Sequence, residues 1–199
     1  MKGQVMADTI RPLAPLVTIA LAASFLLGTG KVWAEPLTYE LDSKESTLKF
    51  IGHATFHSFV GRTRSLQGKM VFDPESQLFA GPEEVIVPVQ SLHTGIWARN
   101  QAMWRMFDAA HYPNIRFTPT KAIKLKDDRY RVEGLLKIRE VERTISFEVK
   151  ASISGDAIEA TGEVPLTTTL FDLKPPSAAG IIRVRKDVLV QFTVYWKRV

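Results

Sequence analysis

The stretch DVLVQFTVYW, Asp187–Trp196, alternates one apolar set of side chains with a mixed set. The apolar set is Val188, Val190, Phe192, Val194 and Trp196. Successive side chains of a β-strand point to opposite faces, so a period of two places this whole set on one face. The stretch is therefore predicted to be a strand that buries one face in a core.

The same period recurs along most of the chain and predicts about eight strands. The other segments that show it are 46–59, 66–73, 83–92, 114–125, 129–138, 142–151 and 157–164. Short strands separated by turns in one domain are typical of an antiparallel sandwich or barrel. Gly52, Gly68 and Gly134 stand where large inward side chains are expected, and such glycines mark bends or close approaches, which favours a closed barrel. An eight-stranded barrel is either filled by its side chains or just wide enough for one small ligand.

One segment departs from this pattern, because the spacing from Trp97 to Ala110 is helical. It predicts one helix with Trp97, Met103, Trp104, Phe107 and Ala110 on one side and Arg99 pointing elsewhere, ended by Pro113. This apolar side is either a plug of ordinary core or a lid that lines a cavity, and the sequence leaves both open.

The first 34 residues have the layout of an export signal. Lys2 and Arg11 precede or flank an apolar run over 13–27, and Val32-Trp33-Ala34 offers a cleavage site. The run is shorter than the roughly 20 residues that a spanning helix needs. We therefore expect a cleaved signal peptide (1–34), one mature domain (35–199) and a periplasmic location; an uncleaved anchor is the alternative.

Composition excludes several classes of protein. The chain of 199 residues has no cysteine, so disulfides, thiolate nucleophiles and sulfur-based metal sites are ruled out. Without the signal segment, 23 of the 26 basic and 20 of the 21 acidic residues remain, a net charge of +3. The basic residues are scattered, so no nucleic-acid partner is expected.

No residue is assigned a catalytic or metal-binding role. His53 and His57 lie four apart on a predicted strand, which separates them by roughly 13 Å at ~3.3 Å per residue, too far for one metal ion. His93 and His111 flank the predicted helix without a partner for catalysis. Phosphate-loop, HExxH and GxSxG motifs are absent, and no cofactor is expected.

The chain resembles the YceI-like family of bacterial exported proteins. The resemblance lies in Ser91-Leu92-His93-Thr94-Gly95, Arg99-Asn100, Met103 and the run Phe107-Asp108-Ala109-Ala110-His111-Tyr112-Pro113-Asn114-Ile115-Arg116-Phe117. It extends to segments 37–42, 46–50, 61–62, 68–73 and 132–138, and to the last strand. It implies an extended, eight-stranded, lipocalin-like antiparallel barrel with one helical segment (about 97–110) at its side, enclosing a tunnel for a long isoprenoid chain.

The chain differs from the family pattern in three places. Asn100 replaces an acidic residue, Arg139-Glu140-Val141 replaces a His-Gly-Val turn, and Thr167–Thr169 replace an arginine before Phe171-Asp172-Leu173. These changes concern the polar groups at the tunnel mouth rather than the barrel.

The resulting hypothesis is a periplasmic protein that binds an apolar isoprenoid lipid, such as a polyprenyl lipid or quinone tail, for carriage or storage. The expected ligand-binding residues are Phe50, Phe56, Met70, Phe72, Trp97, Met103, Trp104, Phe107, Leu136, Phe147, Phe192 and Trp196. The alternatives are an enzyme acting on an apolar substrate and a structural or stress protein with a filled core. A transient contact with a membrane surface and a monomeric or homodimeric state are also expected.

Overall fold

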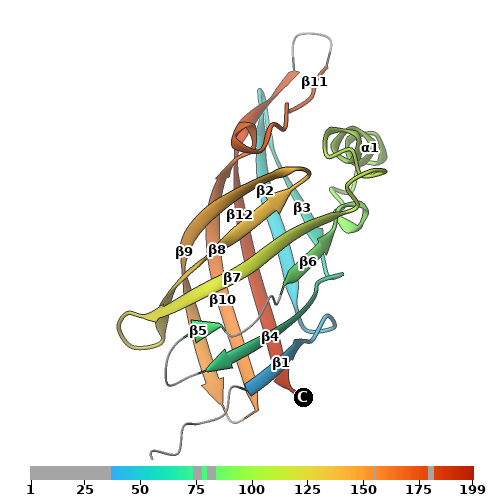
Figure 1. The fold of residues 1–199 in the computed structure, drawn as a ribbon. Helices are drawn as coiled ribbons and strands as arrows, with labels where there is room; N and C mark the ends of the chain where they lie inside the picture. Colours follow the sequence, from blue (N-terminus) through green and yellow to red (C-terminus); the bar gives the residue numbers. More distant parts are fainter. Residues whose placement is uncertain (1–36, 74–77, 80–83, 155, 179–181) are drawn as a thin grey trace, which may run out of the picture. The chain divides into compact units, whose positions relative to one another are not determined.

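A computed structural model describes residues 37–73, 78–79, 84–154, 156–178 and 182–199 (Figure 1). The predicted signal peptide and the boundary after Ala34 lie outside these ranges. The strands are β1 (Leu37–Leu41), β2 (Thr47–Ala54), β3 (Ser58–Thr63), β4 (Gln67–Asp73), β5 (Leu78–Phe79), β6 (Val85–Pro88), β7 (Asn114–Lys124), β8 (Arg129–Ile138), β9 (Val141–Ser154), β10 (Ala157–Thr167), β11 (Ser177–Ala178) and β12 (Ile182–Arg198). The helical elements are η1 (Val89–Ser91), α1 (Trp97–Met106) and η2 (Thr168–Phe171).

The strands form a closed antiparallel barrel, as the alternating pattern predicted. Hydrogen bonding runs from β1 to β4, through the short β5 and β6 that share one position, and then through β7, β8, β9 and β10 to β12. The pairing of β1 with β12 closes the ring at eight positions. Closure removes the exposed edges that an open sheet of this size would leave.

The long strand β12 has two neighbours in succession on one side. At its C-terminal end, Trp196–Arg198 pair with β1, whereas the preceding part from Val184 to Thr193 pairs with β2. β3 then pairs with β2, and a bridge between Arg62 and His93 links β3 to the segment before α1. The barrel is thus extended at the end where β2, β3 and α1 lie (Figure 1).

The inward glycines mark close approaches. A Cβ on Gly134 would lie 2.5 Å from the carbonyl oxygen of Thr118, and the register with β7 shifts just beyond, between Pro119 and Lys121. A Cβ on Gly52 would lie 2.5 Å from the Phe59 ring. Neither site has room for a side chain, in keeping with the role predicted for these glycines.

Two predicted elements end earlier than expected. The helix stops at Met106 instead of Ala110, because Asp108 takes the left-handed conformation with φ 50° and interrupts the helical backbone. The predicted strand 46–59 is a hairpin, since β2 ends at Ala54 and β3 begins at Ser58. Phe56 therefore lies in the turn and is 76% exposed.

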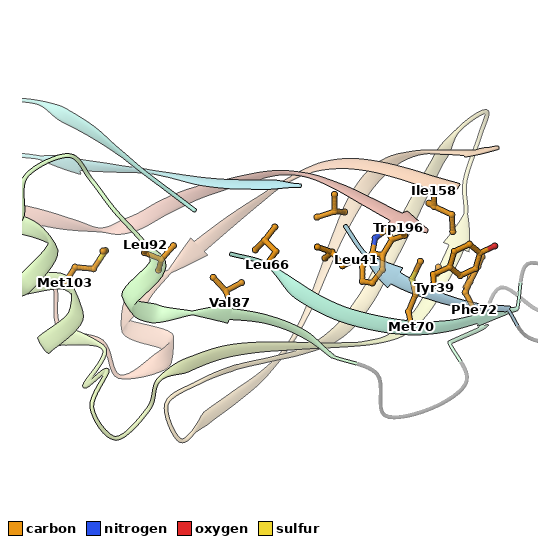
Figure 2. Close-up of a cluster of buried hydrophobic side chains, with 12 residues drawn as sticks. Tyr39, Leu41, Leu66, Met70, Phe72, Val87, Leu92, Met103, Ile158 and Trp196 are labelled. Carbon is orange, nitrogen blue, oxygen red and sulfur yellow. The ribbon is translucent and has the colours of Figure 1, made fainter. Parts of the chain in front are cut away.

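A cluster of buried apolar side chains runs along the inside of the barrel. In Figure 2 the labelled members extend from Met103 on α1 and Leu92, past Leu66 and Val87, to a group at the β1 end. That group contains Tyr39, Leu41, Met70, Phe72, Ile158 and Trp196. Within the described ranges, no helix is both long and apolar enough to cross a membrane.

Candidate functional site: an apolar cavity in the barrel

The barrel encloses a cavity of about 360 Å³, within the range of small-molecule binding sites. Every barrel strand from β7 to β10, together with β2, β3, β4, β6, β12, α1 and η2, contributes wall residues. The wall is almost wholly aliphatic and aromatic. Among the described residues, the charged ones on the wall are Arg99 and Arg185.

The cavity is long, as β12 shows. The wall residues of this strand are Val184, Arg185, Val188, Val190, Phe192, Val194 and Trp196. From Val188 to Trp196 the alternation keeps every second side chain facing inward. From Val188 to Trp196 is eight residues, roughly 26 Å of strand at ~3.3 Å per residue.

The end of the cavity near β1 holds large buried side chains. Tyr39 is 1% exposed and Phe72 and Trp196 are also buried, and the three belong to one cluster. At the other end the wall residues Phe59, Arg99 and Arg185 are only partly buried or exposed. This second end, where α1 and the start of β12 lie, is the mouth of the cavity.

The structure brings most of the predicted binding residues together on the cavity wall. Those on the wall are Phe50, Met70, Phe72, Met103, Phe107, Leu136, Phe147, Phe192 and Trp196. Three aromatic contacts join members of the wall: Phe50 with Phe59, Phe117 with Phe147, and Phe147 with Phe192.

Phe56 and Trp97 were wrongly predicted to face this interior. Phe56 points outward from the β2–β3 turn, so the alternation of β2 does not extend to it. Trp97 is 75% exposed. Trp97 and Met103 are six residues apart, and at ~100° per residue this separates their directions by about 120° around the helix. Because Met103 is buried against the barrel, Trp97 points away from it.

Trp104 is also absent from the wall, because it fastens the helix to the preceding segment. Its indole Nε1–H donates to the carbonyl oxygen of Leu92 at 3.2 Å, and its ring meets that of His93 edge-on with centroids 5.6 Å apart. It packs against the buried cluster without reaching the cavity. The helix has both of the roles that the sequence left open. It lines the cavity through Met103, Met106 and Phe107, and it packs as core through Trp104.

Arg99, expected to point away, lies on the cavity wall. Its guanidinium carbon is 4.6 Å from the centre of the Phe59 ring, and one terminal N–H donates to the carbonyl oxygen of Thr94 at 2.9 Å. Its buried Nε–H has no hydrogen-bond partner among the residues that the structure describes. The spacing of Arg99, Met103 and Met106, four and then three residues, is the signal that could have placed all three on one face.

Asn100, one of the departures from the family pattern, holds the start of the helix. Its Oδ1 accepts hydrogen bonds from the backbone N–H and the hydroxyl of Thr94, at 2.8 and 2.7 Å. Its Nδ2 donates to Nδ1 of His93 at 3.4 Å. A neutral amide here satisfies the buried donors of Thr94 without burying a carboxylate.

The threonine run at 167–169 joins η2 to β12. The Thr167 hydroxyl donates to Asp187 at 2.8 Å, and the Thr168 hydroxyl donates to the carbonyl oxygen of Lys186 at 3.0 Å. η2 in turn buries Phe171, which with Leu173 forms part of the cavity wall near the mouth.

The histidines do not gather into a site. His53 Nδ1 lies 2.8 Å from the Ser58 hydroxyl, and His111 lies against Asp108 at 2.9 Å. Over the part of the chain that the structure describes, no three His, Cys, Asp or Glu side chains are grouped so as to hold a metal ion.

A closed antiparallel barrel with one deep apolar cavity defines a ligand-binding β-barrel. A family model described as the YceI-like domain matches residues 39–196, so the chain belongs to the YceI-like family. The resemblance seen in the sequence is thereby confirmed. No curated protein matches the chain.

Solved structures share the fold at low identity. The structure of BcnA from Burkholderia cenocepacia is 20% identical over 78% of this chain and 98% of its own, with a TM-score of 0.68. A polyisoprenoid binding domain from Saccharophagus degradans, implicated in plant cell wall breakdown, is 20% identical over 82% and 99%, with a TM-score of 0.67. The Campylobacter jejuni YceI protein is 18% identical over 74% and 88%, with a TM-score of 0.59.

Proposed function

We propose that the protein is a periplasmic binding protein that encloses a long isoprenoid-type lipid, a polyprenyl lipid or quinone tail, for carriage or storage. The observation that carries this proposal is the long apolar cavity, lined along β12 from Val188 to Trp196 by one continuous apolar row. The similarity to a polyisoprenoid binding domain supports the choice of an isoprenoid. The predicted signal peptide supports the periplasm.

The energetics favour a long chain. Each buried methylene contributes about 0.8 kcal/mol, whereas association costs on the order of 4–15 kcal/mol before any net affinity results. A short apolar molecule therefore binds weakly in such a cavity, and a long one tightly. Affinity is expected to follow chain length.

The chemistry of the wall supports binding rather than catalysis. Among the wall residues that the structure describes, the titratable groups are Arg99, Arg185 and Tyr130, and none is a carboxylate, histidine or lysine that could act as a general base near pH 7. The same cavity argues against a structural protein with a filled core, because a filled barrel would leave no space of this size.

Exposed apolar side chains around the mouth support transient contact with a membrane. The described ones near the mouth are Phe56, Val60, Ile96, Trp97 and Leu170. They lie on the β2–β3 hairpin, at the start of α1 and on η2. Arg183, Arg185 and Lys186 beside them form no ion pair with any described residue. Aromatic and basic side chains together favour an anionic bilayer surface.

Extraction of the protein purified from its own cells tests the proposal. Organic solvent should release an isoprenoid lipid that mass spectrometry identifies. Ala160→Trp, which places a large ring on the cavity wall, should lose this lipid while its melting temperature stays close to that of the matched control, Thr161→Trp, on the outer face of the same strand. Wild-type protein without lipid, or equal lipid in both variants, would contradict the proposal.

A further inference from the structure

One strand of the sheet keeps a free edge. β3 stands at the end of the hydrogen-bonded order, and among the described strands it pairs with β2 alone. Its other edge is met once, where Arg62 and His93 exchange two backbone hydrogen bonds, at 2.9 and 3.0 Å. Gly95 then takes a φ of 80° and turns the chain toward α1, so this pairing does not continue.

The rest of this edge carries unused backbone groups. In an antiparallel strand, every second residue directs both its N–H and its C=O to the same side. Because Arg62 directs both groups to His93, Val60 and Ser58 direct theirs to the same free edge, where neither has a backbone hydrogen bond to a described residue. Val60 is also 41% exposed. Such an edge can accept a strand from another chain.

A basic groove lies on the outer face of the sheet beside this edge. Lys49 of β2 and Arg62 of β3 stand directly opposite each other, and Arg64 follows just beyond β3. All three are exposed. Ile51 and Val60 add apolar surface to the groove, and none of its described lining residues is acidic.

The cations of the groove have no counter-ion among the described residues. Lys49, Arg62 and Arg64 form no ion pair there. On the outer face of β8 and β9, by contrast, Arg129 and Arg131 both pair with Glu148, at 2.6 and 3.5 Å. Like charges directly opposite each other on neighbouring strands are destabilising. An acidic ligand in the groove would offset this repulsion.

We propose that the free edge of β3 and the basic groove bind an extended acidic segment of a partner protein, which adds to β3 as a further strand. Backbone hydrogen bonds to Val60 provide affinity, and the cations select acidic side chains. A second copy of this chain is a poorer partner, because it would bring two basic grooves together. The site lies on the outer face of the barrel and does not depend on a ligand in the cavity.

Two short peptides test the requirement for charge. One alternates Glu with Val, the other alternates Gln with Val, and both have blocked termini. Their binding to the purified protein is measured by fluorescence anisotropy at low salt. An exposed ion pair contributes a factor of about two to five, so three cations should make the acidic peptide bind about tenfold tighter or more. Added salt should reduce this preference.

Charge variants then place the preference in the groove. Arg62→Gln and Arg64→Gln should each weaken binding of the acidic peptide about twofold to fivefold and leave binding of the Gln peptide unchanged. Arg105→Gln, at an exposed arginine of α1 outside the groove, is the matched control and should change neither.

A change in the backbone tests the addition of a strand. Val60→Pro removes the N–H that faces the free edge, and proline is tolerated there because this N–H does not pair with β2. It should weaken binding of both peptides, whereas Val60→Thr, which keeps the N–H, should not. An acidic peptide that is N-methylated at alternate residues should fail to bind wild-type protein, which tests the same hydrogen bonds without altering the fold.

The outcomes separate this site from the alternatives and from the cavity. Equal affinity of wild-type protein for the two peptides, or full binding of the N-methylated peptide, overturns the proposal. So does a loss of binding to phosphatidylglycerol vesicles in Arg62→Gln with unchanged peptide binding, because it assigns the cations to a membrane surface. Lipid binding in the cavity should be normal in every variant, so failure of this site leaves the proposed function intact.

Discussion

The indole N–H of Trp104 donates to the carbonyl oxygen of Leu92 across 3.2 Å, and this bond ties α1 to the chain segment that enters it. The helix lies beside the mouth, so its attachment determines where Met103, Phe107 and Arg99 stand on the cavity wall. Position of the helix and shape of the mouth are thus linked through one tryptophan that does not itself line the cavity.

Replacing Trp104 by phenylalanine should weaken this attachment without a direct loss of binding. The change removes one hydrogen bond, worth about 0.5–1.5 kcal/mol of the free energy of unfolding. Urea unfolding measures the loss, and Trp97→Phe, at an exposed position of the same helix, should show none. A Trp104→Phe protein of normal stability that no longer binds lipid would place Trp104 in contact with the ligand instead.

Contact with membranes should depend on the apolar side chains at the mouth. Phe56→Ser combined with Trp97→Ser should reduce co-sedimentation with vesicles that contain anionic phosphatidylglycerol, since each change removes an exposed ring that can enter the interface. The melting temperature should not change, because neither ring is buried. Added salt should weaken binding of both proteins through the basic residues. Unchanged sedimentation of the double variant would count against this surface.

Acid should loosen the closure of the barrel at β1. Asp42 accepts hydrogen bonds from Nζ of Lys197 at 2.6 Å and from the N–H of Lys44 at 3.0 Å. The bond from Lys197 holds the pKa of Asp42 below its usual value, and Asp42 raises the pKa of Lys197.

The sign of the effect follows from the lowered pKa of Asp42. Its contribution to stability is complete above the unfolded-state value of about 3.9 and is lost as pH falls through the lower folded-state value. The melting temperature of wild-type protein should therefore fall more steeply below about pH 4 than that of Asp42→Asn. The expected difference in melting temperature is small, because the Asp42–Lys197 pair is partly exposed to solvent. Parallel acid profiles for the two proteins would show that this pair contributes nothing to stability.

The barrel and most of the cavity wall could be predicted from the sequence because a period of two determines the face of every strand residue. Alternation alone predicts that Phe192, Trp196, Phe147 and Leu136 face the cavity. The position of Phe56 could not be predicted in this way, because the alternation continues through a hairpin turn that no glycine or proline marks.

The helix was harder to predict, because its large apolar residues do not share one face. Trp97 and Met103 are both apolar and lie about 120° apart, so composition does not reveal which of them faces the barrel. The predicted helix has Arg99 pointing away from its apolar side, although Arg99 lines the mouth. Arg185 could not be placed, because the register shift beside it leaves no periodic trace in the sequence.

Whether a long cavity accepts an extended chain from the mouth can be tested at the β1 end of the cavity. Trp196 is 6% exposed and lines the cavity beside β1, roughly 26 Å along β12 from Val188 at ~3.3 Å per residue. In protein that lacks the predicted signal peptide and carries Trp97→Phe and Trp104→Phe, it is the remaining tryptophan and reports on this end alone. Its fluorescence is measured during titration with geraniol, farnesol, geranylgeraniol and solanesol, a series of increasing chain length. Affinity is expected to rise along the series, and the emission of Trp196 is expected to change only with the longer chains. Equal affinity and an equal response for geraniol and solanesol would contradict binding of an extended chain in a long cavity.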